Sequence, residues 1–366
     1  MTTAFFHDER SLWHGGGNYA FTLPVGGLVQ PGAGLPENPE TKRRLVNLMR
    51  VTGLIDDLAA QSAPEATRED LLRVHPAAYL DAFKALSDAG GGELGRRTPF
   101  GPGGYEIAAL SAGLAKAALF AVLEGRATNA YALTRPPGHH CLPDWPNGFC
   151  LLNNIAVAIR AAQAAGLARR IAVVDWDVHH GNGTEAVFWT DPDVLTISLH
   201  EEFNYPYDTG AAEARGEGPG TGFNLNIPLP AGTGHAGYLD AIERLVIPAL
   251  RRFAPEAIVV ACGYDASAYD PLGRMLASAD TFRQMTARLK SAAEELCDGR
   301  LILTHEGGYS EAYVPFCGHA VLEALSGSPR TAPDPMAEIV AARQPRPEGQ
   351  THVLDRIRAL EAPFFA

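Results

Sequence analysis

Residues 171–183 read IAVVDWDVHHGNG, an apolar run that leads directly into acidic residues and histidines. Residues 171–174 are apolar and mostly β-branched, as is typical of a strand buried on both faces of a parallel sheet. Since alternate side chains of a strand point to the same face, we expect Asp175, Asp177 and His179 to lie together. Burying two carboxylates without a compensating cation is costly. The stretch therefore predicts a metal site at the end of a buried strand.

The rest of the chain alternates apolar strands with helices. This alternation predicts an α/β fold with a parallel sheet and helices on both faces, in which residues 1–366 form a single domain. We expect residues 1–40 to be irregular and to cover a site entrance, and residues 326–366 to wrap the surface and end in a helix. The expected strands are 130–133, 171–174, 194–199, 258–261 and 301–304, and the expected helices are 41–54, 69–86, 107–125, 154–165, 238–253, 281–296 and 353–360.

Polar motifs follow several of these strands, at the place where parallel sheets bind ligands. Residues 135–140 read RPPGHH, residues 263–265 read GYD and residues 306–309 read EGGY. Asp265 is therefore expected to join Asp177 and His179 as a third metal ligand. Two carboxylates, one imidazole and an open position suit a catalytic zinc. The same oxygen-rich set would also accept Fe(II), Co(II) or Mn(II), so ligand type alone leaves the metal open.

The composition argues against several classes of partner. The 366 residues carry a formal charge of -12 and their longest basic run is Lys42-Arg43-Arg44, so we expect no general binding to nucleic acid or anionic membranes. The acidic balance permits cationic substrates and slightly favours them. Five scattered cysteines without CxxC spacing favour a reducing compartment, and we expect neither a signal peptide nor an apolar stretch of membrane-spanning length. These features predict a cytoplasmic protein.

In their order and spacing, the motifs resemble the histone deacetylase superfamily, in particular its class II branch and the bacterial histone deacetylase-like amidohydrolases and acetylpolyamine amidohydrolases. The resemblance covers roughly residues 41–325 and includes Gly148-Phe149-Cys150 and Ser198-Leu199-His200. It implies the arginase/deacetylase fold, with a mainly parallel sheet of about eight strands and long loops at their carboxyl ends. It further implies a zinc-dependent hydrolase that deacetylates acetyl-lysine or a related N-acyl amine. The implied zinc ligands are Asp177, His179 and Asp265.

Members of this family also carry structural potassium ions. By resemblance, the first potassium would lie beside the zinc and be held, largely through backbone carbonyls, by Asp175, Asp177, His179, Ser198 and Leu199. A second potassium is expected on a weaker local match, around Phe188, Asp191, Val194 and Phe223. The implied cofactors are therefore one Zn²⁺ and one or two K⁺.

The resemblance also implies the catalytic side chains. His139 and His140 are expected to lie side by side at the reacting water, with Asp175 behind His139 and Asn182 behind His140. A carboxylate partner favours the imidazolium form more than an amide partner does. We therefore expect His140 to act as general base and acid while His139 stays largely protonated. Tyr309 is expected to donate its hydroxyl to the developing oxyanion.

The substrate's alkyl chain is expected to enter a narrow apolar channel. Phe149 and Tyr205 resemble its two aromatic walls and Leu272 its rim, and the carbonyl of Gly148 is expected to accept the N–H of the scissile amide. Gly307, close to the catalytic tyrosine, is also expected to contact the substrate. Because relatives often assemble through loops of this kind, we expect a homo-oligomer.

Other functions compete with this reading. The same mechanism would serve an acetylpolyamine hydrolase, or a hydrolase of another small acyl amide or ester. A binuclear manganese ureohydrolase of the same fold would need further acidic ligands where this chain has His180 and Asn182. A non-catalytic acyl-ligand binding protein would be expected to have lost Tyr309, a histidine of the pair or a metal ligand, and all of these are present.

Overall fold

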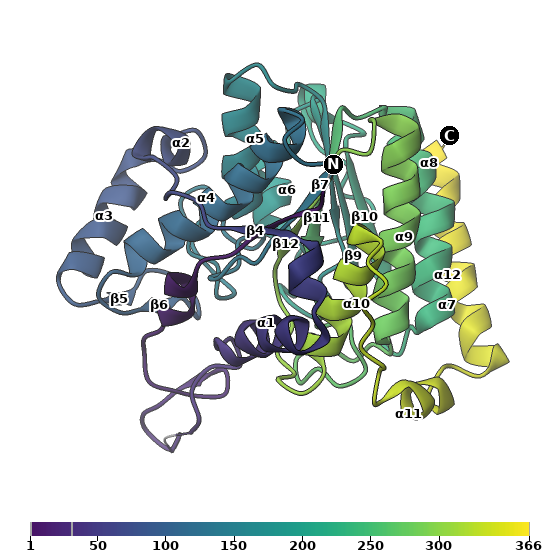
Figure 1. Ribbon diagram of the computed structural model, residues 1–366, viewed down its shortest axis with the longest axis horizontal. Helices are drawn as coiled ribbons and strands as arrows, with labels where there is room; N and C mark the ends of the chain where they lie inside the picture. The colour runs from purple at the N-terminus through teal and green to yellow at the C-terminus, as the bar shows by residue number, and fades with distance from the viewer. Residues whose placement is uncertain (1, 31, 366) are drawn as a thin grey trace.

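An eight-stranded parallel sheet runs through the centre of the computed structural model, which describes residues 2–30 and 32–365 (Figure 1). The strand order is β10-β9-β8-β11-β12-β7-β1-β4, and every neighbouring pair is parallel. This confirms the predicted α/β sheet. The strands are β1 (Ala4–Phe6), β4 (Ala59–Gln61), β7 (Asn129–Ala132), β8 (Ile171–Asp175), β9 (Val194–Glu201), β10 (Asn224–Leu229), β11 (Ala257–Cys262) and β12 (Leu301–His305), and two antiparallel ribbons pair β2 (Tyr19–Ala20) with β3 (Leu23–Pro24) and β5 (Gly92–Glu93) with β6 (Pro99–Phe100).

Helices cover both faces of the sheet (Figure 1). α4 and α5 pack on one face, whereas α1, α7, α8, α9, α10 and α12 pack on the other. The helices are α1 (Glu40–Thr52), α2 (Arg68–Leu72), α3 (Ala77–Asp88), α4 (Gly104–Leu123), α5 (Asn154–Ala164), α6 (Asn182–Phe188), α7 (His235–Ala241), α8 (Ile247–Phe253), α9 (Ala279–Leu296), α10 (Val314–Ser326), α11 (Ala337–Ala342) and α12 (Pro347–Phe365).

Strand β8 contributes side chains to the hydrophobic clusters on both faces of the sheet. Ile171 and Val173 pack with α4 and α5, while Ala172 and Val174 pack with the helices of the opposite face. These four side chains are almost completely buried. Because both faces are covered, the strand carries apolar residues until its last position, Asp175, at the carboxyl-terminal edge of the sheet.

Three strands of the sheet differ from the sequence prediction. β1 lies within the opening segment that we expected to be irregular, and its three residues are buried between β4 and β7. β4 and β10 form the two edges of the sheet. The three residues of β4 are exposed, and β10 contains Pro228, which sheets tolerate only at edges. Short strands and edge strands carry a weak apolar signal, which is why the sequence did not predict them.

Several helices also differ in extent from the prediction. The expected helix at 69–86 is two helices, α2 and α3, because Pro76 lacks an N–H and forms the N-cap of α3. The expected helix at 238–253 contains a π-helical turn, Ile242–Val246, between α7 and α8. The region 326–366 contains α11, and α12 is longer than the expected helix at 353–360. The single-domain prediction includes residues 1, 31 and 366, which lie outside the described residues.

α4 corrects one expectation about apolar stretches. Gly104–Leu123 is long and apolar enough to cross a membrane by length and composition, although we expected no stretch of that length. However, 67% of the qualifying window is buried inside the structure, where α4 contacts α5, β1 and β7. The apolar composition is therefore that of a helix packed between the sheet and its neighbours.

A buried ion cluster attaches the opening segment to the sheet. Oε1 of Glu37 lies 3.2 Å from Nζ of Lys42 and 3.0 Å from Nε of Arg135, and these side chains are at most 3% exposed. Burial alone would raise the pKa of Glu37, but Arg135 and Lys42 outweigh it and lower that pKa to about 2. Arg135 also donates to backbone carbonyls of the opening segment, those of Ser11, Leu12 and His14.

Replacing Glu37 with alanine is expected to lower the free energy of unfolding at pH 7 by ~3–5 kcal/mol, because two buried cations lose their counter-charge. Urea denaturation measures the loss, and Glu295→Ala, which removes the exposed partner of Arg251, is the control that should change little. The folded pKa of Glu37 lies below its ordinary value of 4.5, so the contribution is present above that pH and is lost as the pH falls toward about 2. A loss no larger than that of the control would contradict this role.

Candidate active site

The carboxyl-terminal ends of neighbouring parallel strands bring the predicted polar motifs to one edge of the sheet. β8 ends at Asp175, β11 at Cys262 and β12 at His305. One detail of the prediction is wrong: the strand stops at Asp175, so Asp177 and His179 lie on the turn that follows. Asp175 fixes this turn, because its Oδ1 accepts from the backbone N–H of Asp177 at 3.0 Å.

Asp177, His179 and Asp265 form a buried cluster at this edge. Nδ1 of His179 lies 3.1 Å from Oδ1 of Asp177 and 3.0 Å from Oδ2 of Asp265. Both carboxylates are fully buried, and the imidazole is 7% exposed. One ligand atom from each of the three residues lies within 4.8 Å of the others, so the three could hold one metal ion. The residues predicted as metal ligands therefore meet.

The cluster suits a divalent cation. Tetrahedral zinc with bonds of about 2.0–2.2 Å places its nitrogen and oxygen ligands about 3.3–3.5 Å apart, close to the separations found in the cluster. Without a cation, burial and the Asp177 carboxylate raise the pKa of Asp265 to about 7. Burial also disfavours charge on His179, but the two carboxylates outweigh it and raise the pKa of that imidazole. A bound cation would take the place of these protons.

Backbone groups fix both carboxylates. The N–H of Gly307 donates to Oδ2 of Asp177, and the N–H of Val178 donates to Oδ1 of Asp265, each at 2.8 Å. A side chain at Gly307 would place its Cβ 2.2 Å from Oδ2 of Asp265, so only glycine leaves room for the cluster. Gly307 thus supports the predicted metal ligands, and its contact with substrate stays a prediction.

His139 and His140 lie side by side, with ring centroids 4.0 Å apart. Nδ1 of His139 lies 2.9 Å from Oδ2 of Asp175, and Nδ1 of His140 lies 2.9 Å from Oδ1 of Asn182. Burial opposes charge on His139, but neighbouring carboxylates outweigh it and raise its pKa to about 10. Burial, with the charges of two neighbouring imidazoles, lowers the pKa of His140 well below its ordinary value. One histidine of the pair is thus charged and the other neutral.

A narrow cavity of about 140 Å³ opens beside these groups. The rings of Phe149 and Tyr309 meet edge to face with centroids 5.6 Å apart, and those of Tyr205 and His140 meet in the same way at 5.1 Å. Aromatic side chains therefore line the same cavity as His140 and His179. The wall includes the predicted channel residues Gly148, Phe149, Tyr205 and Leu272, together with His140, His179 and Tyr309.

Comparison with known proteins agrees with this geometry. The sequence profile of the histone deacetylase domain matches residues 35–325. The chain belongs to the histone deacetylase family. Its membership confirms the resemblance drawn from the motifs, and it identifies the chain as related to hydrolases that act on amides.

Similar proteins of the family come from distant organisms. The chain is 58% identical to a histone deacetylase-like amidohydrolase of Pseudomonas aeruginosa, over 99% of this chain and 96% of that protein. It is 38% identical to histone deacetylase 8 of Arabidopsis thaliana, over 82% of each chain. The crystal structure of the HDA15 HD domain superimposes with a TM-score of 0.83 at 33% identity, covering 100% of this chain and 97% of that one. The arginase/deacetylase fold is thereby confirmed.

The residues predicted to hold potassium in this family member form two groups. The first, Asp175, Asp177, His179, Ser198 and Leu199, lies at β8, the turn after it and β9, and Asp175 and Ser198 are cross-strand partners. The second group, Phe188, Asp191, Val194 and Phe223, lies between the end of α6 and the starts of β9 and β10. The carboxylate of Asp191 pairs with Arg160, which leaves backbone carbonyls as the available ligands. Potassium binding stays a prediction.

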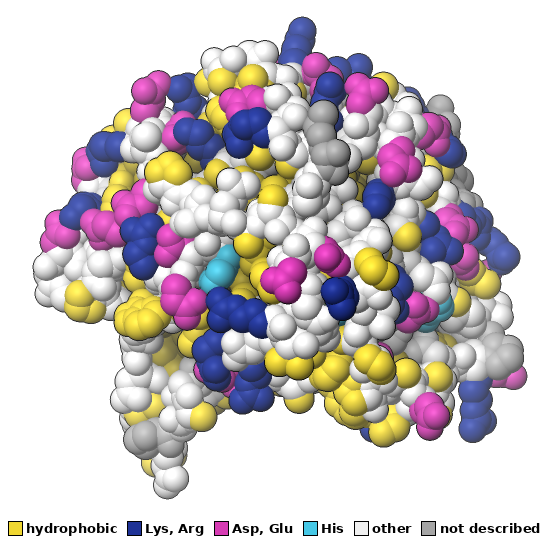
Figure 2. Space-filling model, viewed as in Figure 1, with side chains coloured by type: hydrophobic (Ala, Val, Ile, Leu, Met, Phe, Trp, Pro, Cys, Tyr) yellow, Lys and Arg dark blue, Asp and Glu magenta, His cyan; other side chains and the backbone are white. Residues whose placement is uncertain are grey.

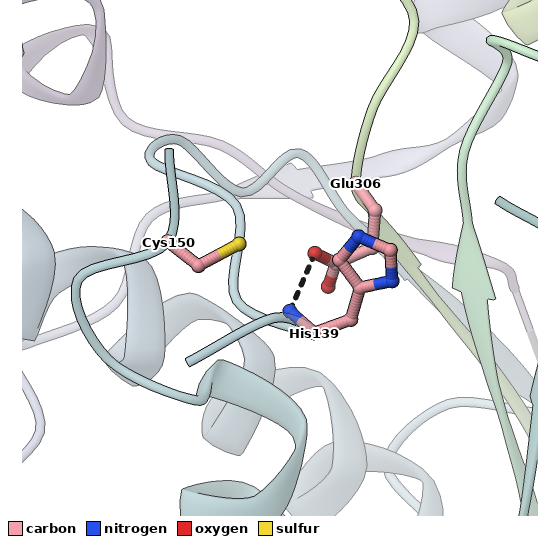
Figure 3. A group of neighbouring side chains, drawn as sticks. All are labelled: His139, Cys150 and Glu306. Atoms are coloured by element: carbon pink, nitrogen blue, oxygen red, sulfur yellow. Dashed lines mark hydrogen bonds between the residues drawn. The ribbon is translucent and has the colours of Figure 1, made fainter. Parts of the chain in front are cut away.

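Glu306 supports the histidine pair in a way that the sequence analysis missed. Its Oε2 accepts from the backbone N–H of His139 at 3.1 Å (Figure 3). It also accepts from the N–H of Gly138 at 2.7 Å, and so fixes the turn that carries the pair. His139, Cys150 and Glu306 also lie close enough together to hold a metal (Figure 3). However, two backbone N–H groups already occupy Oε2 of Glu306, and the Cys150 thiol donates to the Gly148 carbonyl, so both groups have partners within the protein.

Asp270 is a second supporting residue that the sequence analysis missed. Its Oδ2 accepts from the backbone N–H of Tyr309 at 2.7 Å, and its Oδ1 accepts from that of Leu272 at 2.9 Å. The carboxylate therefore connects Tyr309 to Leu272, two residues of the cavity wall. A signal was present in both cases, because Glu306 belongs to the EGGY motif and Asp270 lies two residues before Leu272, which the resemblance had singled out.

Proposed function

We propose that the chain is a zinc-dependent amidohydrolase that removes the acyl group from an N-acyl amine such as acetyl-lysine. The observation that carries the proposal is the buried cluster of Asp177, His179 and Asp265 beside one charged and one neutral histidine. His179 and the neutral His140 also lie in the wall of a cavity lined by aromatic rings. Similar proteins named as deacetylases and as an amidohydrolase support the same reaction. Acetylated polyamines and other small acyl amides or esters are the alternative substrates.

The side chains of the site provide the groups that amide hydrolysis needs. A bound zinc ion would lower the pKa of water and polarise the acyl carbonyl. His140, which is neutral at pH 7, is placed to accept a proton from water and to return it to the departing amine. His139, held in its charged form by the carboxylates of Asp177 and Asp175, would stabilise negative charge on the acyl group. Phe149 and Tyr205 would hold the alkyl chain between their rings.

Tyr309→Phe is expected to lower kcat by ~10²–10³-fold, because it removes a preorganised donor to the oxyanion. Burial and the nearby carboxylates raise the pKa of Tyr309 well above its ordinary value, so its hydroxyl keeps the proton that it donates. The matched control is Tyr205→Phe, whose hydroxyl donates to Asn147 at 3.0 Å and which should lose far less. Steady-state kinetics with an acetyl-lysine substrate measures both. Nearly full activity in Tyr309→Phe would exclude this role.

The side chains argue against the binuclear manganese alternative. Nδ1 of His180 lies 2.9 Å from Oγ1 of Thr209, and its Nε2 lies 3.2 Å from Oε2 of Glu185. The side chain of Asn182 is the hydrogen-bond partner of His140. Beside the metal cluster, the described residues thus present an imidazole and an amide where a second manganese would need carboxylates. Two tightly bound manganese ions per chain would favour that alternative.

A direct assay tests the proposed function. The purified chain is incubated with acetyl-lysine peptides and acetylpolyamines, before and after treatment with a chelator. We expect amine release that the chelator abolishes and added zinc restores. Turnover that the chelator leaves intact would refute the metal mechanism, and binding without turnover would favour a non-catalytic protein.

Four further proposals rest on the sequence and on the family resemblance. We propose that the protein is cytoplasmic, that it assembles as a homo-oligomer and that potassium stabilises the turn after β8. We also propose that it binds neither nucleic acid nor membranes, because its formal charge is -12 and its basic residues form only short runs.

A further inference from the structure

Two arginines stand at the mouth of the acyl cavity. Arg97 is the only Lys, Arg, Asp or Glu among the described residues of the cavity wall. Its guanidinium carbon lies 5.6 Å from the ring centroid of Tyr205, and that of Arg96 lies 5.9 Å from the same centroid. Because Tyr205 is itself part of the cavity wall, both positive charges lie close to the cavity that a substrate would enter.

No carboxylate neutralises these two charges within the described parts of the chain. Neither Arg96 nor Arg97 forms an ion pair or a side-chain hydrogen bond there. The carboxylate of Glu93, on the same loop, instead accepts from the hydroxyl of Tyr19 at 2.7 Å and from the N–H of Thr98 at 3.0 Å. The guanidinium of Arg97 therefore keeps its donors available at the cavity.

Backbone hydrogen bonds connect both arginines to residues of the cavity wall. The carbonyl of Arg96 accepts from the N–H of Gly148, and that of Arg97 accepts from the N–H of Phe149, each at 3.1 Å. Arg97 has a φ of 61°, in the left-handed region that residues other than glycine rarely adopt. Such a conformation persists where surrounding contacts enforce it, and here those contacts come from the residues that form the cavity. The backbone position of Arg97 is thus fixed by contacts with residues of the cavity wall.

A second cavity, on the opening segment's side of Arg97, adds no free negative charge. It encloses about 210 Å³, and its wall includes Arg97, Arg135 and Glu37. Glu37 is the only carboxylate among the described residues of this wall, and it is already shared by Arg135 and Lys42. Neither cavity wall therefore offers Arg97 a free carboxylate.

We propose that Arg97, with Arg96 beside it, binds a carboxylate of the substrate at the cavity mouth. This inference rests on the proposed amidohydrolase function and narrows its substrates to N-acyl amines that carry a carboxylate near the acylated chain. A guanidinium can bind a carboxylate through two parallel, charge-assisted hydrogen bonds. The carboxylate belongs either to a free acylated amino acid or to an acidic residue beside an acyl-lysine in a peptide.

Two arginines near the cavity would favour anionic substrates, whereas the net charge of the chain led us to expect a slight preference for cationic amines. Acidic and basic side chains are interspersed over the face of the molecule in Figure 2, so the net charge of -12 does not describe each part of the surface. In physiological salt, exposed charges farther apart than about 8 Å are largely screened from one another. The charges at the mouth therefore decide which substrates are favoured.

Matched substrates test the inference. We would measure kcat/KM for acetyl-lysine peptides that differ only in an Asp, Asn or Lys beside the acetyl-lysine, and for single acetyl-lysine with a free α-carboxylate or a carboxamide. In at least one of the two sets, the kcat/KM of the wild type should be about tenfold higher for the carboxylate-bearing substrate than for its neutral counterpart. Arg97→Asn, whose asparagine tolerates the left-handed backbone, should reduce this ratio of kcat/KM values to about one. Arg97→Lys should keep part of the preference. Arg251→Gln, at an exposed pair with Glu295, is the control that should keep all of it.

The outcomes separate this inference from the proposed function. The inference would be overturned if the wild type hydrolysed carboxylate-bearing and neutral substrates equally well in both sets, or if the preference survived in Arg97→Asn. Turnover in these assays would still support the proposed function. A preference in only the peptide set or only the single-residue set identifies the source of the carboxylate. If no substrate is turned over, the proposed function fails, and fluorescence anisotropy with the labelled Asp and Lys peptides then reads the preference directly. Equal affinities in that measurement would overturn the inference.

Discussion

Asp265→Ala is expected to abolish metal binding and to lower kcat/KM by at least about a thousandfold, more than the 10–100-fold typical of losing a partner behind a metal ligand. The carboxylate holds one oxygen 3.0 Å from Nδ1 of His179, and its other oxygen accepts from the N–H of Val178. Removing it leaves one carboxylate and one imidazole, which is too small a ligand set for tight zinc binding.

The matched control for this variant is Asp70→Ala. Asp70 is also a buried aspartate, but it pairs with Lys116 and caps α2, away from the cluster. Its loss should lower thermal stability while metal content and kcat/KM per folded molecule stay near those of the wild type. If Asp265→Ala retained its metal and its activity, Asp265 would not be a ligand.

His140→Ala is expected to lower kcat by ~10²–10⁴-fold, because it removes the neutral imidazole that accepts and returns the proton. His139→Ala should lose less at high pH, where stabilisation by a charged imidazole contributes least. The two variants differ because the carboxylates of Asp177 and Asp175 hold His139 in its charged form, whereas burial keeps His140 neutral. Profiles of kcat/KM against pH measure this division of roles.

A matched pair of variants strengthens the test of the two histidines. Asn182→Ala and Asp175→Asn change the partners of His140 and His139 without removing either imidazole. We expect Asp175→Asn to change the pH profile in the same direction as His139→Ala. Equal losses with identical profiles in His139→Ala and His140→Ala would refute the assignment.

The metal cluster could be predicted from sequence because its residues interrupt an apolar pattern. Asp175 ends β8, and Asp265 follows β11 after a glycine and a tyrosine. Charged residues directly after buried strands conflict with their surroundings unless they serve a site. Because the carboxyl ends of parallel strands meet at one edge, their convergence could be inferred without distances. The roles of the histidine pair, by contrast, came from the family resemblance.

Other features depend on contacts that no local pattern reports. β10 is fully buried although Asn224 and Asn226 alternate with its apolar residues. Both amides donate to the carboxylate of Glu185, so polar side chains replace the usual apolar face. Glu306 lies in a motif quoted from the sequence, but its contact with the N–H of His139 joins segments distant in sequence. The same holds for the contact between the carbonyl of Arg97 and the N–H of Phe149. Such contacts leave no periodic signal and become recognisable only when the strands and loops have been placed.

Metal analysis of the purified chain tests the central claim most directly. We predict one tightly bound divalent ion per chain, with zinc supporting activity, that leaves together with the activity on chelation and is absent from Asp265→Ala. Full activity in protein that contains no metal, or two equivalents of metal bound with equal affinity, would contradict a single zinc centre at Asp177, His179 and Asp265.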